Sequence, residues 1–214
     1  MTHRLTEDAK GVYIISATPF SDDGAVDHDS LTRLTEFYIE KGVAGITILG
    51  MMGEAPKLTA EESRDVIAAV MKAVADRVPV VVGVSNAGLD NLVSLAETSM
   101  DAGAAGVMIA PNAGAKTESG VIAAFETIAN RLPGVPLVYQ DFPLSTSMPI
   151  SAGAFTKLVS DIPTVVMLKH EDWPGLDKLS AVRAAESDGA RRISILTANG
   201  GIFLPFELIR GADG

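Results

Sequence analysis

Short apolar runs rich in β-branched residues alternate along the chain with longer segments of helical period, and this alternation constrains the fold more than any other feature. The runs, which we predict to be strands, cover residues 12–17, 44–49, 78–84, 105–110, 135–140, 164–169 and 193–197. Helices are predicted between them at about 29–41, 59–74, 90–102, 119–129, 151–160 and 176–185. Strands that are apolar at successive positions are buried on both faces, which is typical of a parallel sheet covered by helices.

The spacing of the runs favours a barrel. Successive runs begin roughly 30 residues apart, which is the size of one strand–helix unit. Seven units with one period predict an α/β fold of the (β/α)8 TIM barrel type rather than a doubly wound sheet. No change of composition marks a boundary, so we expect residues 1–214 to form a single barrel domain.

A small internal repeat marks three predicted helix exits. The first glycine of each copy suits the left-handed position after a helix, and the second lets the chain turn into the next strand. The copies are Gly42-Val-Ala-Gly45, Gly103-Ala-Ala-Gly106 and Gly211-Ala-Asp-Gly214. Because the third copy ends the sequence, we expect a barrel truncated before or at its eighth strand, in a protein that continues beyond Gly214 and whose C-terminal part is missing here. An open barrel would expose the edges of its first and seventh strands.

Composition excludes several classes of protein. Against 17 basic residues there are 27 acidic ones, and the net charge of −10 repels both nucleic acid and an anionic bilayer. The chain has no cysteine and three histidines that are far apart in sequence, so we expect no metal site. No apolar run reaches the roughly 18 residues of a membrane span, and the N-terminus lacks the apolar core of a signal peptide. We therefore expect a cytoplasmic protein that binds neither nucleic acid nor membrane.

Lys169 is the unusual residue of the apolar runs. It ends the sixth run, and alternation along an extended strand places it on the same face as Met167 and Val165. The active sites of barrel enzymes lie at the carboxyl ends of the strands. If this face points into the barrel, burial disfavours the ammonium form and yields an amine that can attack a carbonyl carbon and form a Schiff base. The alternative is an ammonium that pairs with Glu171 or Asp172, or that reaches water at the barrel mouth.

Two other strand ends carry candidate groups. Residues 49–54, Leu-Gly-Met-Met-Gly-Glu, form a glycine-flanked turn whose N–H groups suit a carboxylate. A tight loop in which Met51 and Met52 pack and Glu54 ties adjacent loops together explains the same residues. The fifth run ends at Gln140, and because a buried amide needs partners, this side chain faces either a substrate or a backbone carbonyl.

These motifs, in this order, resemble the dihydrodipicolinate synthase/N-acetylneuraminate lyase family of class I aldolases. The resemblance covers nearly the whole chain and rests on Gly11-Val-Tyr-Ile-Ile-Ser-Ala-Thr-Pro-Phe20, Asp23-Gly-Ala-Val-Asp27, Gly50-Met-Met-Gly-Glu54, the Gly103 helix exit, Gln140-Asp-Phe-Pro143 and Lys169. It implies a homotetramer of (β/α)8 barrels with C-terminal helices and no metal or organic cofactor. In this family the lysine of strand six, here Lys169, binds pyruvate or another 2-oxo acid as a Schiff base. The resemblance further implies substrate contacts from Thr18, Met51, Met52, Gly53 and Glu54.

The sequence also departs from the family pattern. Met51 and Met52 replace the usual Thr-Thr pair, which keeps the backbone donors but removes the hydroxyls. The register of the fifth strand puts Gln140 where the family has a proton-transferring tyrosine, and Tyr139 faces the other side of the strand. Further departures are Ser145 in place of the synthases' substrate-binding arginine, and Asn112 and Ala113 in place of a tyrosine pair after strand four. These changes argue against true dihydrodipicolinate synthase activity.

The segments Gln140-Asp-Phe-Pro143 and Lys169-His-Glu171 are similar to the branch of the family that includes 2-keto-3-deoxy sugar-acid dehydratases. Glu171 lies two residues after the lysine and, in this interpretation, shuttles a proton in place of the missing tyrosine. Otherwise it only forms an ion pair with Lys169 or with a neighbouring loop. His170 should point toward the helices, and Asn199 and Gly200 are expected to line the pocket for the sugar chain.

The main hypothesis is a Schiff-base lyase, aldolase or dehydratase, acting on a small 2-oxo acid such as a 2-keto-3-deoxy sugar acid. Lys169, Gln140 and Glu171 are its predicted catalytic residues, and N–H groups around Met52 and Gly53 would hold the carboxylate. The alternative is a non-catalytic 2-oxo acid binding protein that keeps the lysine pocket. An unrelated phosphate-binding barrel isomerase is disfavoured, because the glycine-containing loop at 197–201 lacks its eighth-strand partner.

Overall fold

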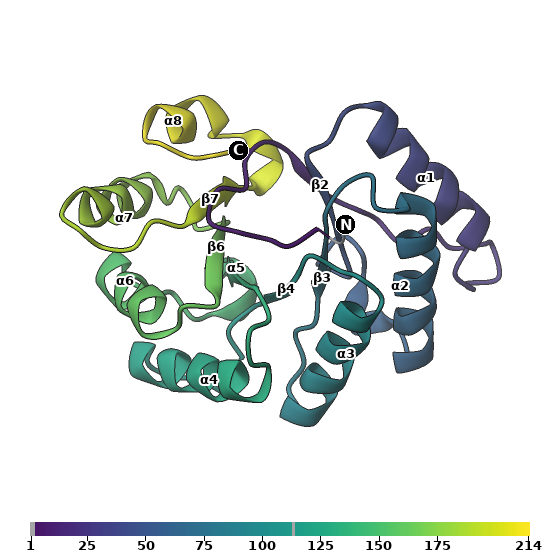
Figure 1. Ribbon diagram of the computed structural model, residues 1–214, viewed down its shortest axis with the longest axis horizontal. Helices are drawn as coiled ribbons and strands as arrows, with labels where there is room; N and C mark the ends of the chain where they lie inside the picture. The colour runs from purple at the N-terminus through teal and green to yellow at the C-terminus, as the bar shows by residue number, and fades with distance from the viewer. Residues whose placement is uncertain (1–2, 113) are drawn as a thin grey trace.

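The computed structural model describes residues 3–112 and 114–214, in which seven parallel strands form a nearly closed barrel. Ala113, one of the residues in place of the tyrosine pair, lies outside the described residues. Each strand is hydrogen-bonded to the next in chain order, and the helices surround them (Figure 1). The strands are β1 (Tyr13–Ile15), β2 (Gly45–Ile48), β3 (Val80–Gly83), β4 (Gly106–Ile109), β5 (Leu137–Asp141), β6 (Val165–His170) and β7 (Ser194–Thr197). The predicted barrel fold, truncated before strand eight, is confirmed.

The helices are α1 (His28–Glu40), α2 (Ala60–Val74), α3 (Leu89–Asp101), α4 (Glu118–Arg131), α5 (Pro143–Thr146), α6 (Ala152–Asp161), α7 (Leu176–Ser187) and α8 (Leu204–Ile209). Two 3₁₀ turns, η1 (Ala55–Lys57) and η2 (Asn199–Gly201), complete the elements of the described residues. All six predicted helices are confirmed, with ends that shift by one or two residues. The sequence did not predict α5, α8 or the 3₁₀ turns, because segments this short do not show a helical period.

The glycine repeat takes the backbone geometry that the sequence predicts. Gly42, Gly103 and Gly211 all have positive φ, at 77°, 95° and 95°. The second glycines allow close approach: a Cβ on Gly214 would lie 2.1 Å from the carbonyl oxygen of Gly11. The glycines of the repeat are therefore explained by backbone conformation and close backbone approach.

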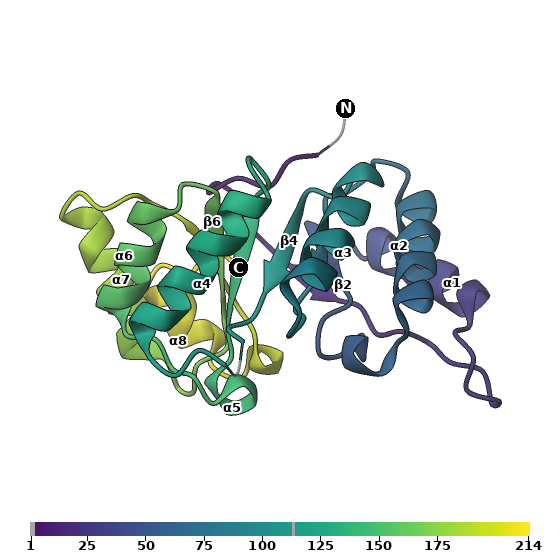
Figure 2. The same cartoon turned by 90° about the horizontal axis from the view of Figure 1, so that it is seen from below.

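Two apolar clusters lie on the two faces of the sheet. The outer cluster joins strands to helices, and the inner one contains Leu5, Val81, Ala105, Met108, Val138, Val166, Met167 and Leu196. The N-terminal segment supplies Leu5, whose N–H donates to the Ala105 carbonyl beside the start of β4. Figure 2 shows α5, which follows β5, at the opposite end of the strands from the N-terminus. The carboxyl ends of the strands are thus separate from the end that Leu5 fills.

One residue of β6 interrupts the alternation of inward and outward side chains. Leu137 of β5 pairs with Val165, but the next residue of β5 pairs with Met167, so Val166 is an extra residue of the kind found in a β-bulge. As a result, Val165 packs in the outer cluster and Met167 in the inner one. The prediction that Lys169 shares its face with Met167 is confirmed. The prediction that it shares a face with Val165 is wrong, because a bulge reverses the alternation.

The last residues lie between the two edges of the sheet. The N–H of Asp213 donates to Ile195 of β7, and the Asp213 carbonyl accepts from Gly11, just before β1. The Asp213 carboxylate binds Arg183 at 2.6 Å and also Arg192. One extended segment thus bonds to both edges, so the gap at this end of the barrel is about one strand wide.

Candidate active site

Lys169 faces the interior of the barrel near the carboxyl end of β6. It pairs in register with Gln140 of β5 and with Leu196 of β7, and Leu196 belongs to the inner cluster. Register partners in a parallel sheet share a face. The Lys169 residue is 7% exposed, so its amine is held away from bulk water and from the outer helices.

Three predicted catalytic residues meet around one oxygen. The Lys169 Nζ lies 2.9 Å from Glu171 Oε1, and the Gln140 Nε2 donates to the same oxygen at 2.9 Å. All three residues are buried. Of the partners considered for Lys169, the structure selects Glu171, and the amide of Gln140 fixes where that carboxylate points.

The buried pair has a chemical consequence. Removing one member of a buried ion pair leaves an uncompensated charge, which costs about 3–5 kcal/mol. The short contact also gives the ammonium proton an acceptor within hydrogen-bond distance. Lys169 can therefore give this proton to Glu171 without releasing it to solvent, and a neutral amine inside the barrel is a nucleophile.

The loop after β2 has a different arrangement from the one predicted. The N–H of Gly53 donates to the Gly50 carbonyl at 3.1 Å, so this predicted carboxylate donor is already used. The N–H groups of Met51 and Met52 have no hydrogen-bond partner among the described residues, and both side chains are exposed. The prediction that methionines pack into the barrel top is wrong. Of the predicted substrate-binding residues in this loop, Met51 and Met52 are the ones whose N–H groups stay open among the described residues.

Thr18 and Glu54 have contacts within the loops. The Thr18 hydroxyl is buried and donates to the Gly53 carbonyl at 2.7 Å, which joins the loop after β1 to the loop after β2. Glu54 takes a left-handed backbone conformation and binds Lys57, three residues on, at 2.6 Å. The expectation that Glu54 ties adjacent loops together is wrong, because its carboxylate turns back into its own loop. Thr18 makes that connection instead.

Asn199 and Gly200 form the 3₁₀ turn η2 after β7, where the sequence placed them at the barrel mouth. Both have positive φ, at 56° and 65°. The Nδ2 of Asn199 is buried and has no hydrogen-bond partner in the described structure. A buried amide without a partner costs free energy, so this donor is suited to an additional polar group.

The strand faces opposite the lysine also carry polar residues. Tyr139 points to the helices, as predicted, and packs between Phe125 and Phe155 with ring centroids 5.0 and 5.4 Å away. His170 also points outward, as predicted, and its Nε2 donates to the Gly175 carbonyl. Asp141, which was not among the predicted site residues, is buried beside His170 and binds Lys178 of α7 at 2.8 Å. Only the position of Asp141 in the strand-five motif could have indicated it.

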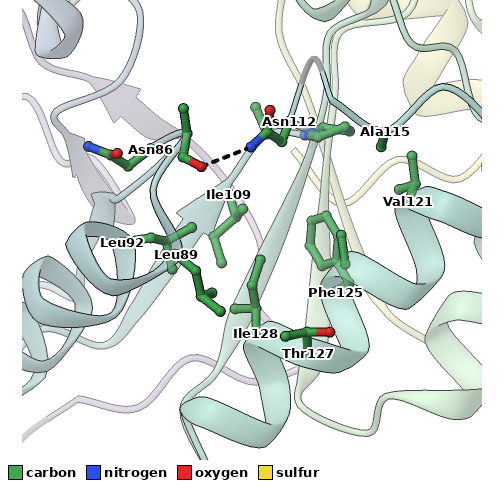
Figure 3. Close-up of a pocket in the computed structure, with 14 residues that line it drawn as sticks. Asn86, Leu89, Leu92, Ile109, Asn112, Ala115, Val121, Phe125, Thr127 and Ile128 are labelled. Atoms are coloured by element: carbon green, nitrogen blue, oxygen red, sulfur yellow. Dashed lines mark hydrogen bonds between the residues drawn. The ribbon is translucent and has the colours of Figure 1, made fainter.

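A cavity of about 200 Å³ lies between α3 and α4 (Figure 3). Its walls are mostly apolar and include Leu92, Ile109 and Phe125. At its rim the Asn112 Nδ2 donates to the Ala87 carbonyl at 3.3 Å. None of the predicted site residues lines this cavity, so it is separate from the lysine cluster.

Two findings concern the expectation of no metal site and the expectation of no membrane span. Within residues 3–112 and 114–214, no group of three or more His, Cys, Asp or Glu side chains is arranged to hold a metal ion. In the same residues, every helix is too short or too polar to cross a bilayer.

The profile of the Dihydrodipicolinate synthetase family matches residues 8–206. The chain is 34% identical over 162 residues to the 4-hydroxy-tetrahydrodipicolinate synthase of Persephonella marina, covering 75% of this chain and 55% of that protein. It is 30% identical over 208 residues to that of Aquifex aeolicus, covering 96% and 68%. The crystal structure of a dihydrodipicolinate synthase from Rhodopseudomonas palustris matches with a TM-score of 0.96 and 46% identity, over 99% of this chain and 71% of that one.

The chain therefore spans between 55% and 71% of the length of these relatives. The matched profile covers all seven described strands and the helices α1 to α7 in full. Together with the shared fold, this match shows that the chain belongs to the dihydrodipicolinate synthetase family.

Proposed function

We propose that this chain carries the reactive centre of a Schiff-base lyase, an aldolase or dehydratase that acts on a small 2-oxo acid. The contact that carries the proposal is the one between the buried Lys169 Nζ and Glu171 Oε1, at 2.9 Å inside the barrel. Family membership supports it, because the relatives from Persephonella marina and Aquifex aeolicus are 4-hydroxy-tetrahydrodipicolinate synthases. Family membership also argues against the hypothesis that this chain is an unrelated phosphate-binding isomerase.

Imine formation begins when Lys169 passes a proton to Glu171. The free amine adds to the C2 carbonyl carbon, and a proton moves from nitrogen to the former carbonyl oxygen. Glu171 then returns its proton to that hydroxyl, which leaves as water while the C2–N iminium forms. Gln140 donates to Glu171 throughout and keeps the carboxylate in place.

The iminium withdraws electrons from C3, and two outcomes follow. If a base removes a C3 proton, the enamine expels the C4 hydroxyl with a proton as water, which is a dehydration. If a base instead removes the proton of the C4 hydroxyl, the C3–C4 bond breaks to give an aldehyde and the enamine of pyruvate. We assign the base to Glu171, since Gln140 stands where the family has its tyrosine. A 2-keto-3-deoxy sugar acid has both the C3 methylene and the C4 hydroxyl, and we propose this class as substrate.

The open donors suggest how such a substrate is held. We place its carboxylate on the N–H groups of Met51 and Met52, in the segment where Gly53 and Glu54 complete the turn and Thr18 anchors it. The unpartnered Nδ2 of Asn199, beside Gly200, supplies a polar contact for the hydroxylated chain. By family resemblance we also propose a homotetramer in the cytoplasm, to be checked by light scattering and by cell fractionation.

Trapping with borohydride tests the proposed function. The chain is incubated with pyruvate and sodium borohydride and then digested, and its peptides are analysed by mass spectrometry. We expect one reduced pyruvate adduct, located on Lys169 and missing in Lys169→Arg, which keeps the charge but forms no such imine. Lys157, an exposed lysine of α6, should stay unmodified. An intact chain with no adduct on Lys169 would overturn the assignment.

A second candidate is a 2-oxo acid binding protein without turnover. It is favoured by Gln140, because an amide does not exchange protons in the way that a phenol or carboxylate does. A panel of 2-keto-3-deoxy acids assayed for loss of substrate distinguishes the two. Turnover that disappears in Glu171→Gln supports the lyase, whereas adduct formation without any turnover supports the binding protein.

A further inference from the structure

A second row of polar residues crosses the sheet directly behind the lysine cluster. Asp141, His170 and Thr197 are register partners on β5, β6 and β7. They face the helices, because the residues before them in β5 and β6, Gln140 and Lys169, face the interior. Asp141 and His170 are 1% and 0% exposed. The two strands that hold the reactive groups are thus backed by buried polar side chains, where apolar packing is usual.

The ring of His170 has an acceptor at each nitrogen. Its Nε2 lies 3.0 Å from the carbonyl oxygen of Gly175, and its Nδ1 lies 3.5 Å from Oδ2 of Asp141. A carbonyl can only accept a hydrogen bond, so Nε2 carries a proton and donates it to the Gly175 carbonyl.

The backbone around the ring is shaped for this contact. Gly175 precedes α7 with a φ of 61°, and a Cβ there would lie 2.4 Å from the His170 Nε2. The absence of a side chain at this position therefore lets the ring reach the carbonyl. Two polar atoms face each other without a hydrogen bond, the Nδ1 of His170 and the carboxylate of Asp141, whose Oδ1 also has no partner.

Charged groups from several elements surround the ring. The acidic groups that face it are Asp141 from β5, Asp172 from the following loop and Glu207 from α8, and the cation is Lys178 of α7. Burial raises the pKa of Glu207 above its usual value, and the Thr197 hydroxyl opposes that rise. Lys178 binds both Asp141 and Asp172, so the outer row is also tied to α7.

The outer row is coupled to the inner one through the backbone. The N–H of Glu171 donates to the carbonyl of Asp141 at 2.9 Å, so the strand end that bears the proposed base is tied to the outer carboxylate. His170 is bonded covalently to both Lys169 and Glu171. A change in the distance between the β5 and β6 ends would therefore shift the contact that the Gln140 amide makes with Glu171.

We propose that His170 is a positioning residue: its Nε2 bond to the Gly175 carbonyl and its place beside Asp141 fix the strand ends that align Lys169, Glu171 and Gln140. This role rests on the proposed lysine centre. It does not require that His170 touch the substrate. Removal of the imidazole should loosen the alignment while the fold remains.

Positioning is measured by the rate at which borohydride traps pyruvate on Lys169. His170→Asn keeps a neutral donor near Nδ1, and we expect it to lower the maximal trapping rate about tenfold while the half-saturating pyruvate concentration changes much less. The matched control is His28→Asn, which is exposed at the start of α1 and should trap at the normal rate.

The outcomes separate the two proposals. Equal maximal rates for His170→Asn and the unmodified chain would refute positioning and leave the lysine centre intact. Failure of the unmodified chain to trap pyruvate would refute the lysine centre itself. If His170→Asn does not fold, Asp141→Asn provides the same comparison, with a slower trapping rate expected.

Discussion

Gln140 and Lys169 are register partners on neighbouring parallel strands, and their side-chain nitrogens both lie 2.9 Å from one oxygen of Glu171. The strand pairing sets the spacing of the amide and the ammonium, and the carboxylate two residues farther on closes the group. The amine at this position is therefore buried and has a carboxylate within hydrogen-bond distance. Several measurements follow from this geometry.

Glu171→Gln should destabilise the chain and slow trapping. Removal of the carboxylate leaves the Lys169 ammonium buried without its counter-ion, so we expect a loss of about 3 kcal/mol or more. Urea denaturation measures the free energy of unfolding. The double variant Lys169→Met/Glu171→Leu replaces the pair by apolar groups and should recover most of that loss. If the double variant is the less stable of the two, the pair is not an electrostatic unit.

Tyr139→Phe should stabilise the chain. The Tyr139 hydroxyl is buried without a hydrogen-bond partner, and removal of such a group is worth about 1 kcal/mol. Burial also raises the pKa of Tyr139 above its usual range, with smaller contributions from Asp141 and Glu118. The folded state therefore keeps the proton after the unfolded chain loses it, and the unmodified chain should lose stability relative to Tyr139→Phe above about pH 10. Urea midpoints across alkaline pH test both statements, and parallel curves would contradict the second.

Gly175→Ala should cost more stability than Gly134→Ala. Both glycines have positive φ, at 61° and 77°, so each alanine pays backbone strain of about 1 kcal/mol. Only at Gly175 would the new Cβ meet the imidazole of His170, since nothing lies within 4 Å of a Cβ at Gly134. The difference between the two free energies of unfolding measures that contact. Equal losses would mean that the ring moves aside freely.

Ala124→Leu should stabilise the chain by about 0.5–2 kcal/mol, because it fills space in the cavity between α3 and α4. Ala123, the preceding residue of α4, is exposed, so Ala123→Leu changes the same helix without filling the cavity. Thermal melting of the two variants gives the comparison. A melting temperature that rises equally in both would attribute the gain to helix propensity rather than to packing.

Much of this arrangement could be predicted from sequence, because its main signals are local. Lys169 and Glu171 are two residues apart on one strand, which puts them on one face. Their partner Gln140 stood out as an amide in an apolar run. The glycine exits also depend only on near neighbours, and the structure contains them.

The remaining features depend on contacts that are distant in sequence or on small backbone choices. Asp141 binds Lys178 across 37 positions, and no pattern in either segment indicates the pair. The Glu54 carboxylate binds Lys57 because the Glu54 backbone has a left-handed φ. A glutamate in the sequence gives no signal of that conformation. The Gly53 N–H is likewise occupied by a hydrogen bond inside its own loop, which the sequence does not indicate. The proposed carboxylate donors are therefore the N–H groups of Met51 and Met52.

The extra residue at Val166 determines which side chain of β6 faces the interior of the barrel. With strict alternation from Val165, which packs outward, Lys169 would also point outward and His170 would occupy the interior. A single inserted position exchanges the two, so that an amine meets the enclosed space and an imidazole meets the helices. Deletion of one valine from this strand would therefore place the imidazole of His170 in the enclosed space and the amine of Lys169 against the helices. Only another shift in the register of β6 would reverse that exchange.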